Sequence, residues 1–139
     1  MNKLNLGCGT NWQKNYPEYD GLDIENYGQK FVGDIIQIIK SLQNDTYDEI
    51  MANHFLEHFT QDELKFLFNE INRILKNNCI FKFVVPHKDR PEAWDLTHKT
   101  FWNENTVKTI EILKGFGSWC MESCVTNQRK DIHSVLRKI

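Results

Sequence analysis

Short strand-like segments alternate with helix-like segments along most of this 139-residue chain. Alternation of this kind is typical of α/β folds, in which helices connect the strands of a mostly parallel sheet. The strand-like segments are residues 3–6, 20–24, 30–33, 48–52 and 79–85. The last segment, residues 118–139, divides at Asn127-Gln128-Arg129-Lys130 into the two strands of a hairpin. We therefore expect an open, mostly parallel sheet that ends in an antiparallel β-hairpin.

The strongest helical pattern lies between the fourth and fifth strands. Its apolar residues recur with the spacing of one buried helix face: Leu64, Leu67, Phe68, Ile71, Ile74 and Leu75. Thr60 and Glu63 are placed as a capping box at the start of this helix. Asn77-Asn78 is its expected end, because asparagine tolerates the left-handed conformation that often follows a helix.

Two shorter helices are expected, one over residues 35–42 and one over residues 105–114. In the second helix, Val107, Ile110 and Leu113 would face inward. Gly115 would then form its C-terminal cap.

The connections in the first half of the chain are short. About ten residues separate the first two strands and about five separate the second from the third, whereas a parallel crossover usually needs a dozen or more. The first connection carries Trp12, Tyr16 and Tyr19 and shows no helical pattern. We expect the helices to be trimmed in this half, and the third strand to be a short edge fragment.

Composition excludes several classes of protein. The chain is 40% hydrophobic and 12% aromatic, and its length fits one domain with one core over residues 1–139. A net charge of −2 without a basic block lacks the electrostatic pattern of a protein that binds duplex nucleic acid. No apolar run approaches the ~18 residues of a membrane span, and no signal peptide is recognisable. We expect a cytoplasmic protein.

The four cysteines, Cys8, Cys79, Cys120 and Cys124, include no CxxC pair. Cys120 and Cys124 fall in a predicted strand, which would place them on one face about 13 Å apart, too far for a disulfide. We expect all four to be reduced thiols.

A glycine pair and an acidic residue mark the candidate site. Gly7 and Gly9 directly follow the first strand, and Asp23 lies at the end of the second. Ligands of open α/β sheets bind outside the carboxyl ends of the strands, where glycines permit close approach and free N–H groups can hold a carboxylate. Asp23 is suited to accept hydrogen bonds from two ribose hydroxyls. The third glycine and the helix of a dinucleotide site are missing, which favours a nucleoside ligand without a pyrophosphate; a plain tight turn is the alternative.

Five short blocks occur in a fixed order along the chain. They are Leu4-Asn5-Leu6-Gly7-Cys8-Gly9-Thr10, Gly21-Leu22-Asp23-Ile24, Gly33-Asp34-Ile35, Tyr47-Asp48-Glu49-Ile50 and Leu56-Glu57-His58-Phe59. Together they resemble the class I S-adenosylmethionine-dependent methyltransferases, and the resemblance extends through residues 95–98 to the closing hairpin. It implies a compact Rossmann-like methyltransferase sheet and S-adenosylmethionine as the cofactor.

The resemblance also implies roles for single residues in the first half of the site. Gly7, Cys8 and Gly9 would lie against the methionine part of the cofactor. Asp23 would bind the ribose hydroxyls, with Ile24 beside it.

Four more residues would complete the cofactor site. Asp34 would face the adenine amino group, with Ile35 packing on the ring, and Asn53 and His54 would line the pocket near the sulfonium. Asn11 stands where family members often carry a third glycine, so the cofactor would be more exposed on that side, and Trp12 or Tyr16 could cover it instead.

A base helps methyl transfer when the acceptor is a hydroxyl or a protonated amine. The candidate catalytic residues are His58, His87, His98 and Asp95. Each histidine has a structural alternative, a packed turn for His58 and a solvated loop for the other two. A metal site built from His87, Asp95 and His98 is a further alternative, but their spacing is not that of ligand motifs, and we expect no metal.

The leading hypothesis is a methyltransferase acting on an oxygen or nitrogen nucleophile of a small molecule, such as a sugar or other metabolite. Asn53-His54-Phe55-Leu56 stands where the amino-methylating nucleic-acid enzymes carry Asn-Pro-Pro-Tyr or Asp-Pro-Pro-Tyr. The alternatives are an accessory module that binds the cofactor without transferring methyl groups, an enzyme that cleaves S-adenosylmethionine, and, if the cofactor is another one, a nicotinamide-dependent reductase. The short chain leaves little for an acceptor domain, so a second copy or another protein could complete the acceptor site.

Overall fold

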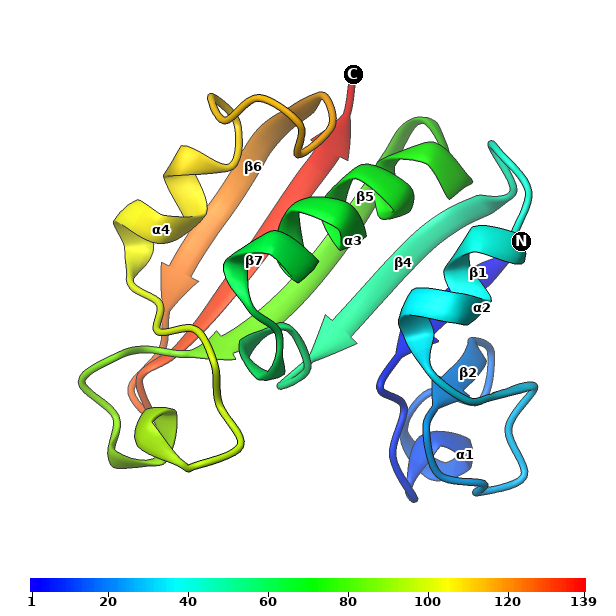
Figure 1. The fold of residues 1–139 in the computed structure, drawn as a ribbon, viewed down its shortest axis with the longest axis horizontal. Coiled ribbons are helices and arrows are strands. Elements are labelled where there is room, and N and C mark those ends of the chain that lie inside the picture. The colour runs from blue at the N-terminus through cyan, green and yellow to red at the C-terminus, as the bar shows by residue number, and fades with distance from the viewer.

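Seven strands form a single sheet in the computed structural model, which describes residues 1–139. The strands are β1 (Lys3–Leu6), β2 (Asp20–Asp23), β3 (Phe31–Val32), β4 (Tyr47–Asn53), β5 (Leu75–Pro86), β6 (Trp119–Thr126) and β7 (Asp131–Lys138). Their order across the sheet is β3-β2-β1-β4-β5-β7-β6 (Figure 1). Strands β1 to β5 are parallel to one another, and β7 pairs antiparallel with both β5 and β6. The expected mostly parallel sheet with a closing hairpin is confirmed.

The helices that connect these strands are short except for one. They are α1 (Trp12–Asn15), α2 (Ile35–Ser41), α3 (Gln61–Ile74) and α4 (Glu104–Thr109), with 3-10 turns η1 (Leu56–His58) and η2 (Pro91–Trp94). The predicted capping box of α3 is confirmed, since the Thr60 hydroxyl accepts from the Glu63 N–H and the Glu63 carboxylate accepts from the Thr60 N–H. None of these helices is both long and apolar enough to span a membrane.

Helices α2, α3 and α4 all lie on one face of the sheet (Figure 1), and the core is on that side. Its cluster of 25 buried residues joins the inward face of α3 to alternate residues of the central strands. The fully buried ring of Phe68 lies at its centre, with ring centroids 5.7 Å from Phe81 and 5.8 Å from Phe83. The apolar face of the helix, which repeats every 3.6 residues, therefore packs on the inward-facing alternate residues of the strands in one aromatic layer.

The opposite face of the sheet carries the side chains that alternate with this core. Lys82 of β5 lies there beside Glu49 of β4, with Nζ and Oε2 3.2 Å apart. Tyr19, from the connection between β1 and β2, covers part of this face, its ring centroid 5.3 Å from Lys3 Nζ and 5.8 Å from Lys82 Nζ. This polar, partly exposed face agrees with the expected trimming of helices, and β3 is the expected two-residue edge fragment.

The end of α3 was predicted incorrectly. The helix stops at Ile74, and Asn77 and Asn78 lie within β5, which begins at Leu75. Leu75 already has extended backbone angles and pairs with Tyr47 of β4. Asn78 does adopt the left-handed conformation, with φ 64°, but it does so near a register shift in the β4–β5 ladder and not at the helix end. Strand pairing has overridden the helix-stop signal.

Two other helix predictions need correction. A single turn, α1, forms in the first connection, where we expected no helix, and it has no buried residue. Helix α4 ends at Thr109 instead of residue 114, because the following N–H groups of Ile110 and Ile112 bond three residues back and tighten the chain into turns. As a result Leu113 is 41% exposed, not inward, and Gly115 lies beyond the helix with φ 87°.

The expected shared face of Cys120 and Cys124 is also wrong. A register shift between Met121 and Ser123 changes the alternation of β6, so Cys120 is exposed while Cys124 packs against the core. All four cysteines are free thiols, as expected.

Replacing Phe68 by alanine should lower the free energy of unfolding by about 3–5 kcal/mol, because the truncation leaves a cavity in the aromatic layer. Phe66 on the same helix is the matched control: it is only partly buried, and alanine there should cost about 1 kcal/mol. Urea denaturation followed by circular dichroism measures both. Equal losses for the two variants would contradict this location of the core.

Candidate functional site

A cavity of about 470 Å³ opens at the carboxyl ends of β1, β2 and β4. Of the predicted cofactor residues, those that line it are Gly7, Asp23, Ile24, Asp34, Ile35 and His54. Its remaining walls are formed by Leu22, Gly33, Ile36, Phe55, His58, Phe59 and Glu63. Cys8, Gly9 and Asn53 do not line the cavity, although each lies within two residues of a lining residue in the sequence.

The glycine loop after β1 needs glycine at both positions. Gly7 and Gly9 have φ values of 67° and 69°, which side-chain-bearing residues rarely adopt, and a Cβ at Gly7 would collide with the ring of Phe55. The N–H groups of Gly7 and Cys8 both donate to the Leu22 carbonyl, at 2.8 and 3.1 Å. These two N–H groups are therefore not free to receive a ligand carboxylate.

The Asp23 carboxylate connects the loop to the end of β2. Its Oδ2 accepts from the Gly9 N–H at 3.0 Å and its Oδ1 accepts from the Glu25 N–H at 3.1 Å. An ionised carboxylate has about four acceptor positions, so each oxygen retains capacity for a hydroxyl donor in the cavity. Asp23 thus holds the glycine loop in place and can still accept from a ligand.

A second acidic residue and two isoleucines form the far part of the cavity. Asp34 caps helix α2 through its Oδ1, which accepts from the Ile36 N–H at 2.8 Å, and this leaves its other oxygen available. Ile35 is buried, whereas Ile24 is 69% exposed at the cavity wall. Apolar walls with an acceptor at each end are suited to a flat, partly polar ring system.

Cys8 points away from this cavity toward β2. A Cβ at Gly21 would lie 2.8 Å from the Cys8 Sγ, so the thiol occupies the space that this glycine leaves. Burial, with a smaller contribution from the Asp23 charge, raises the pKa of the Cys8 thiol to about 11. The thiol is therefore protonated at neutral pH.

Neither aromatic residue proposed as a cover contributes to the cavity. The Trp12 indole N–H donates to the Tyr27 carbonyl at 3.0 Å and fastens α1 to the loop after β2. Tyr16 lies instead beside Asn53, whose Nδ2 is 3.5 Å from the Tyr16 hydroxyl.

A smaller cavity of about 240 Å³ brings together three of the four predicted catalytic residues. His58, Asp95 and His98 line it with His54, Glu57, Pro86, Arg90 and Glu92, and none of these side chains is hydrophobic apart from the proline ring. His54 and His58 also line the 470 Å³ cavity, so the two spaces adjoin. Glu57 and Arg90 were not identified as site residues from the sequence. For Glu57, its position in the Leu56-Glu57-His58-Phe59 block was the only available signal.

His54 lies between these cavities with a left-handed backbone, φ 51°. Its Nδ1 is 3.7 Å from Glu57 Oε2 and its Nε2 is 3.9 Å from Asp131 Oδ1. The pKa of His54 is raised, mainly by the interaction with the Glu57 carboxylate and then by the Asp131 charge, against the effects of burial and of Arg90. Arg90 in turn forms an ion pair with Asp131.

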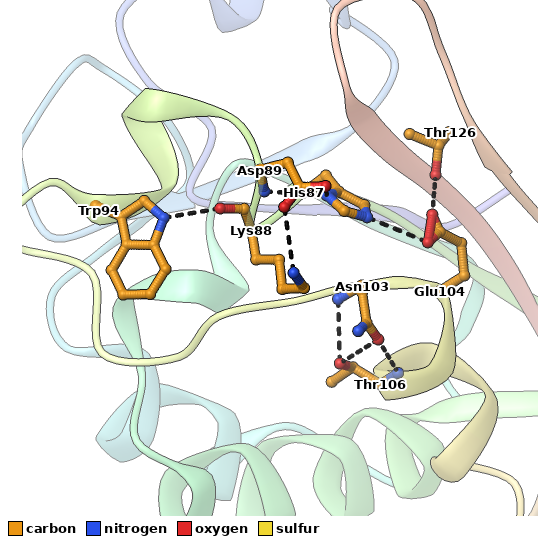
Figure 2. A network of polar contacts seen from close by, with 8 residues as sticks. All are labelled: His87, Lys88, Asp89, Trp94, Asn103, Glu104, Thr106 and Thr126. Atoms are coloured by element: carbon orange, nitrogen blue, oxygen red, sulfur yellow. Dashed lines mark hydrogen bonds and ion pairs between the residues drawn. The ribbon is translucent and has the colours of Figure 1, made fainter.

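His87 does not line this cavity and belongs to a different network of polar contacts, which Figure 2 shows. Its Nε2 is 3.2 Å from Glu104 Oε1, and its Nδ1 accepts from the Asp89 N–H at 3.1 Å. Glu104 also accepts from the Thr126 hydroxyl at 2.7 Å, and this bond is the main reason that its pKa is lowered. With both ring nitrogens engaged, His87 connects the end of β5 to α4 and β6, and the structure does not bring it together with the other candidates.

The sequence matches no family model and no curated protein. Solved structures do resemble the chain. A SAM-dependent methyltransferase from Archaeoglobus fulgidus superposes with a TM-score of 0.76 at 19% identity, over 99% of this chain and 86% of that one. The 1,6-didemethyltoxoflavin-N1-methyltransferase of Burkholderia thailandensis, solved with 1,6-didemethyltoxoflavin and S-adenosylhomocysteine, gives 0.72 at 16%, over 98% and 70%. The chain has the class I methyltransferase fold.

A third neighbour is a protein from Haloferax volcanii solved in complex with the Trm112 methyltransferase activator, with a TM-score of 0.74 at 14% identity over 98% of this chain and 81% of that one. The resemblance to the methyltransferases that we noted in the sequence is thus confirmed for the fold over nearly the whole chain. At identities this low the shared fold does not establish a shared reaction, so the chemistry has to follow from the residues of the site.

This methyltransferase-fold chain has its largest cavity, about 620 Å³, on the sheet face without long helices. Its lining residues include Asn53, His54, Arg129, Asp131 and His133. His54 therefore borders all three cavities.

The four thiols should differ in their reaction with iodoacetamide. The thiolate is the reactive form, and a pKa of about 11 leaves roughly one Cys8 thiol in a thousand ionised at pH 8. At pH 7.5 the exposed Cys120 should react first and Cys8 should stay unmodified. Cys8 should become reactive only as the pH rises through 10. Peptide mass spectrometry measures each site, and modification of Cys8 and Cys120 at similar rates at pH 7.5 would contradict the buried position of Cys8.

Proposed function

We propose that this protein binds S-adenosylmethionine and transfers its methyl group to an oxygen or nitrogen nucleophile of a small molecule. The observation that carries the proposal is the 470 Å³ cavity at the carboxyl ends of β1, β2 and β4, in a fold shared with methyltransferases. Ligand cavities of about 300–1,000 Å³ are typical for molecules of this size.

The residues present fit this cofactor. The Asp23 carboxylate, already held by two N–H groups, has acceptor positions for the two ribose hydroxyls. Asp34 has a free oxygen for the adenine amino group, and Ile24 and Ile35 supply apolar surface for the ring. The exposed side chain of Ile24 would be covered by this contact.

S-adenosylmethionine, when bound, supplies a methyl group that is already electrophilic. The chain has to align the nucleophile with that carbon and to exclude water. Phe55 and Phe59, whose ring centroids are 4.9 Å apart, form an apolar wall of the cavity and exclude water there. His54 and His58 lie at the boundary with the polar cavity, where an acceptor can approach.

The acceptor site that we propose is the polar 240 Å³ cavity. His58, His98 and Asp95 can contact an acceptor there, and His54 is a fourth group that can accept or donate a proton. His87 is left out of this proposal because both its ring nitrogens are engaged elsewhere. The small size of the cavity favours a metabolite-sized acceptor over a macromolecule.

A second candidate is a cofactor-binding accessory module that acts with another protein. The polar sheet face without long helices favours this reading, because a second copy or a partner could cover it and extend the 620 Å³ cavity. The Haloferax volcanii neighbour was solved with a protein activator.

Calorimetric titration with S-adenosylmethionine and S-adenosylhomocysteine tests the proposal. Wild type should bind both, and Asp23→Ala should weaken binding at least about tenfold, since a hydrogen bond to a charged group contributes about 1.5–3 kcal/mol. Asp20→Ala is the matched control on the same strand: Asp20 pairs with Lys30 outside the cavity, and affinity should not change.

Binding followed by formation of S-adenosylhomocysteine with hydroxyl- or amine-bearing metabolites would support the transferase. Binding without turnover in any acceptor panel would favour the accessory module, and release of methylthioadenosine without acceptor would favour cleavage. Absence of binding by wild type would exclude all three.

A further inference from the structure

Glu57, His58 and His98 form a cluster of potential metal ligands at the wall of the polar cavity. One ligand atom from each residue lies within 4.8 Å of the others. Glu57 and His58 belong to η1, whereas His98 lies forty residues later, in the loop after η2. The Glu57 carbonyl accepts from the N–H groups of Lys99 and Thr100, at 2.8 and 3.3 Å, which fastens the loop carrying His98 to η1.

The Glu57 side chain is the group that points to a missing ligand. It is 1% exposed, and its Oε1 is buried without any hydrogen-bond partner. Its Oε2 lies 3.7 Å from His54 Nδ1, which is longer than a hydrogen bond. A buried carboxylate is costly unless it is paired or coordinates a cation. Protonated His54 can pair with Oε2, but Oε1 is left without a partner, and a cation bound there would supply one.

Each of the two histidines has its Nδ1 beside a backbone carbonyl. His98 Nδ1 lies 3.0 Å from the Ala93 carbonyl, and His58 Nδ1 lies 3.4 Å from the Thr97 carbonyl. A backbone carbonyl can only accept, so each Nδ1 carries the proton and each Nε2 presents a lone pair. A ligating histidine commonly donates its other N–H to a carbonyl in this way.

We propose that Glu57, His58 and His98 bind one divalent transition-metal ion, with its open coordination positions directed to the 240 Å³ cavity. Two imidazole nitrogens and one carboxylate oxygen suit Zn²⁺, Mn²⁺ or Fe²⁺ better than Ca²⁺, which prefers oxygen ligands only. This set shares only His98 with the one considered from the sequence, because His87 is engaged by Glu104 and Asp89.

The metal ion also specifies the acceptor of the proposed methyl transfer, and this part of the inference rests on the proposed function. An ion in this position would bind an oxygen of the acceptor and lower the pKa of a hydroxyl. The hydroxyl proton passes to solvent water, the oxygen–carbon bond forms as the methyl carbon–sulfur bond breaks, and the sulfur keeps the electron pair. The acceptor class is therefore a hydroxyl-bearing small molecule.

Titration of the metal-free protein with Co²⁺ and with Zn²⁺, in the absence of S-adenosylmethionine, tests the site. Wild type should bind one ion per chain, with visible Co²⁺ absorption bands in the Co²⁺ titration and heat in the Zn²⁺ titration. His58→Ala and His98→Ala should each lose affinity at least about tenfold, since changing a residue that only supports a ligand already costs 10–100-fold. His133→Ala is the matched control, because His133 is an exposed histidine on β7 outside the cluster.

Glu57→Gln should have the same effect, with folding checked by circular dichroism because Glu57 is buried. His58 and His98 are only partly buried, so their variants decide the question if Glu57→Gln unfolds. Failure of wild type to bind either ion, or wild-type affinity in His98→Ala, would overturn the metal site. Metal binding in a protein that does not bind S-adenosylmethionine would support the site and overturn the proposed function alone.

Discussion

The packing of α3 onto β4 and β5 is the interaction on which the rest of this structure depends. Helices α2, α3 and α4 all lie on one face of the sheet, so nearly all apolar burial occurs there, around Phe68 and the aromatic residues of β5. The other face carries ion pairs such as Lys82–Glu49 and contributes less. A sheet with one apolar layer is the physical consequence of connections too short to build crossover helices on both sides.

The same packing positions the candidate site. It sets the register of β4 against β1 and β5, so that the carboxyl ends of the parallel strands meet and the chain leaves β4 directly into η1. The glycine loop, Asp23 and Asp34 then border one cavity, and Glu57 and His58 border the next. The site is built almost wholly from backbone turns and strand ends, which explains how a short chain can retain a cavity large enough for a nucleoside cofactor.

Much of the fold could be predicted because its signals are local and repeat. The alternation of strand-like with helix-like segments indicated the α/β sheet, the i, i+3, i+4 spacing indicated α3, and Thr60 with Glu63 indicated its start. The errors occurred where pairing with a distant strand decides the conformation: Leu75 enters β5 because Tyr47 is opposite, and the bulge in β6 separates Cys120 from Cys124. Likewise, the sequence indicates His87 as a catalytic candidate, but in the fold its ring is engaged by Glu104, seventeen residues away.

By itself the sequence determined the α/β class, the hairpin, the glycine turn after β1 and the acidic residues that follow β2 and β3 closely or end them, since these depend on side-chain periodicity and on local turn residues. Only the tertiary structure decided which polar groups meet. Glu57 and His58 are neighbours in the chain, but His98 joins them through the hydrogen bonds from Lys99 and Thr100 to the Glu57 carbonyl. The Glu57 carboxylate is likewise buried by packing. Distant segments exclude solvent from it, and no local sequence pattern predicts such burial.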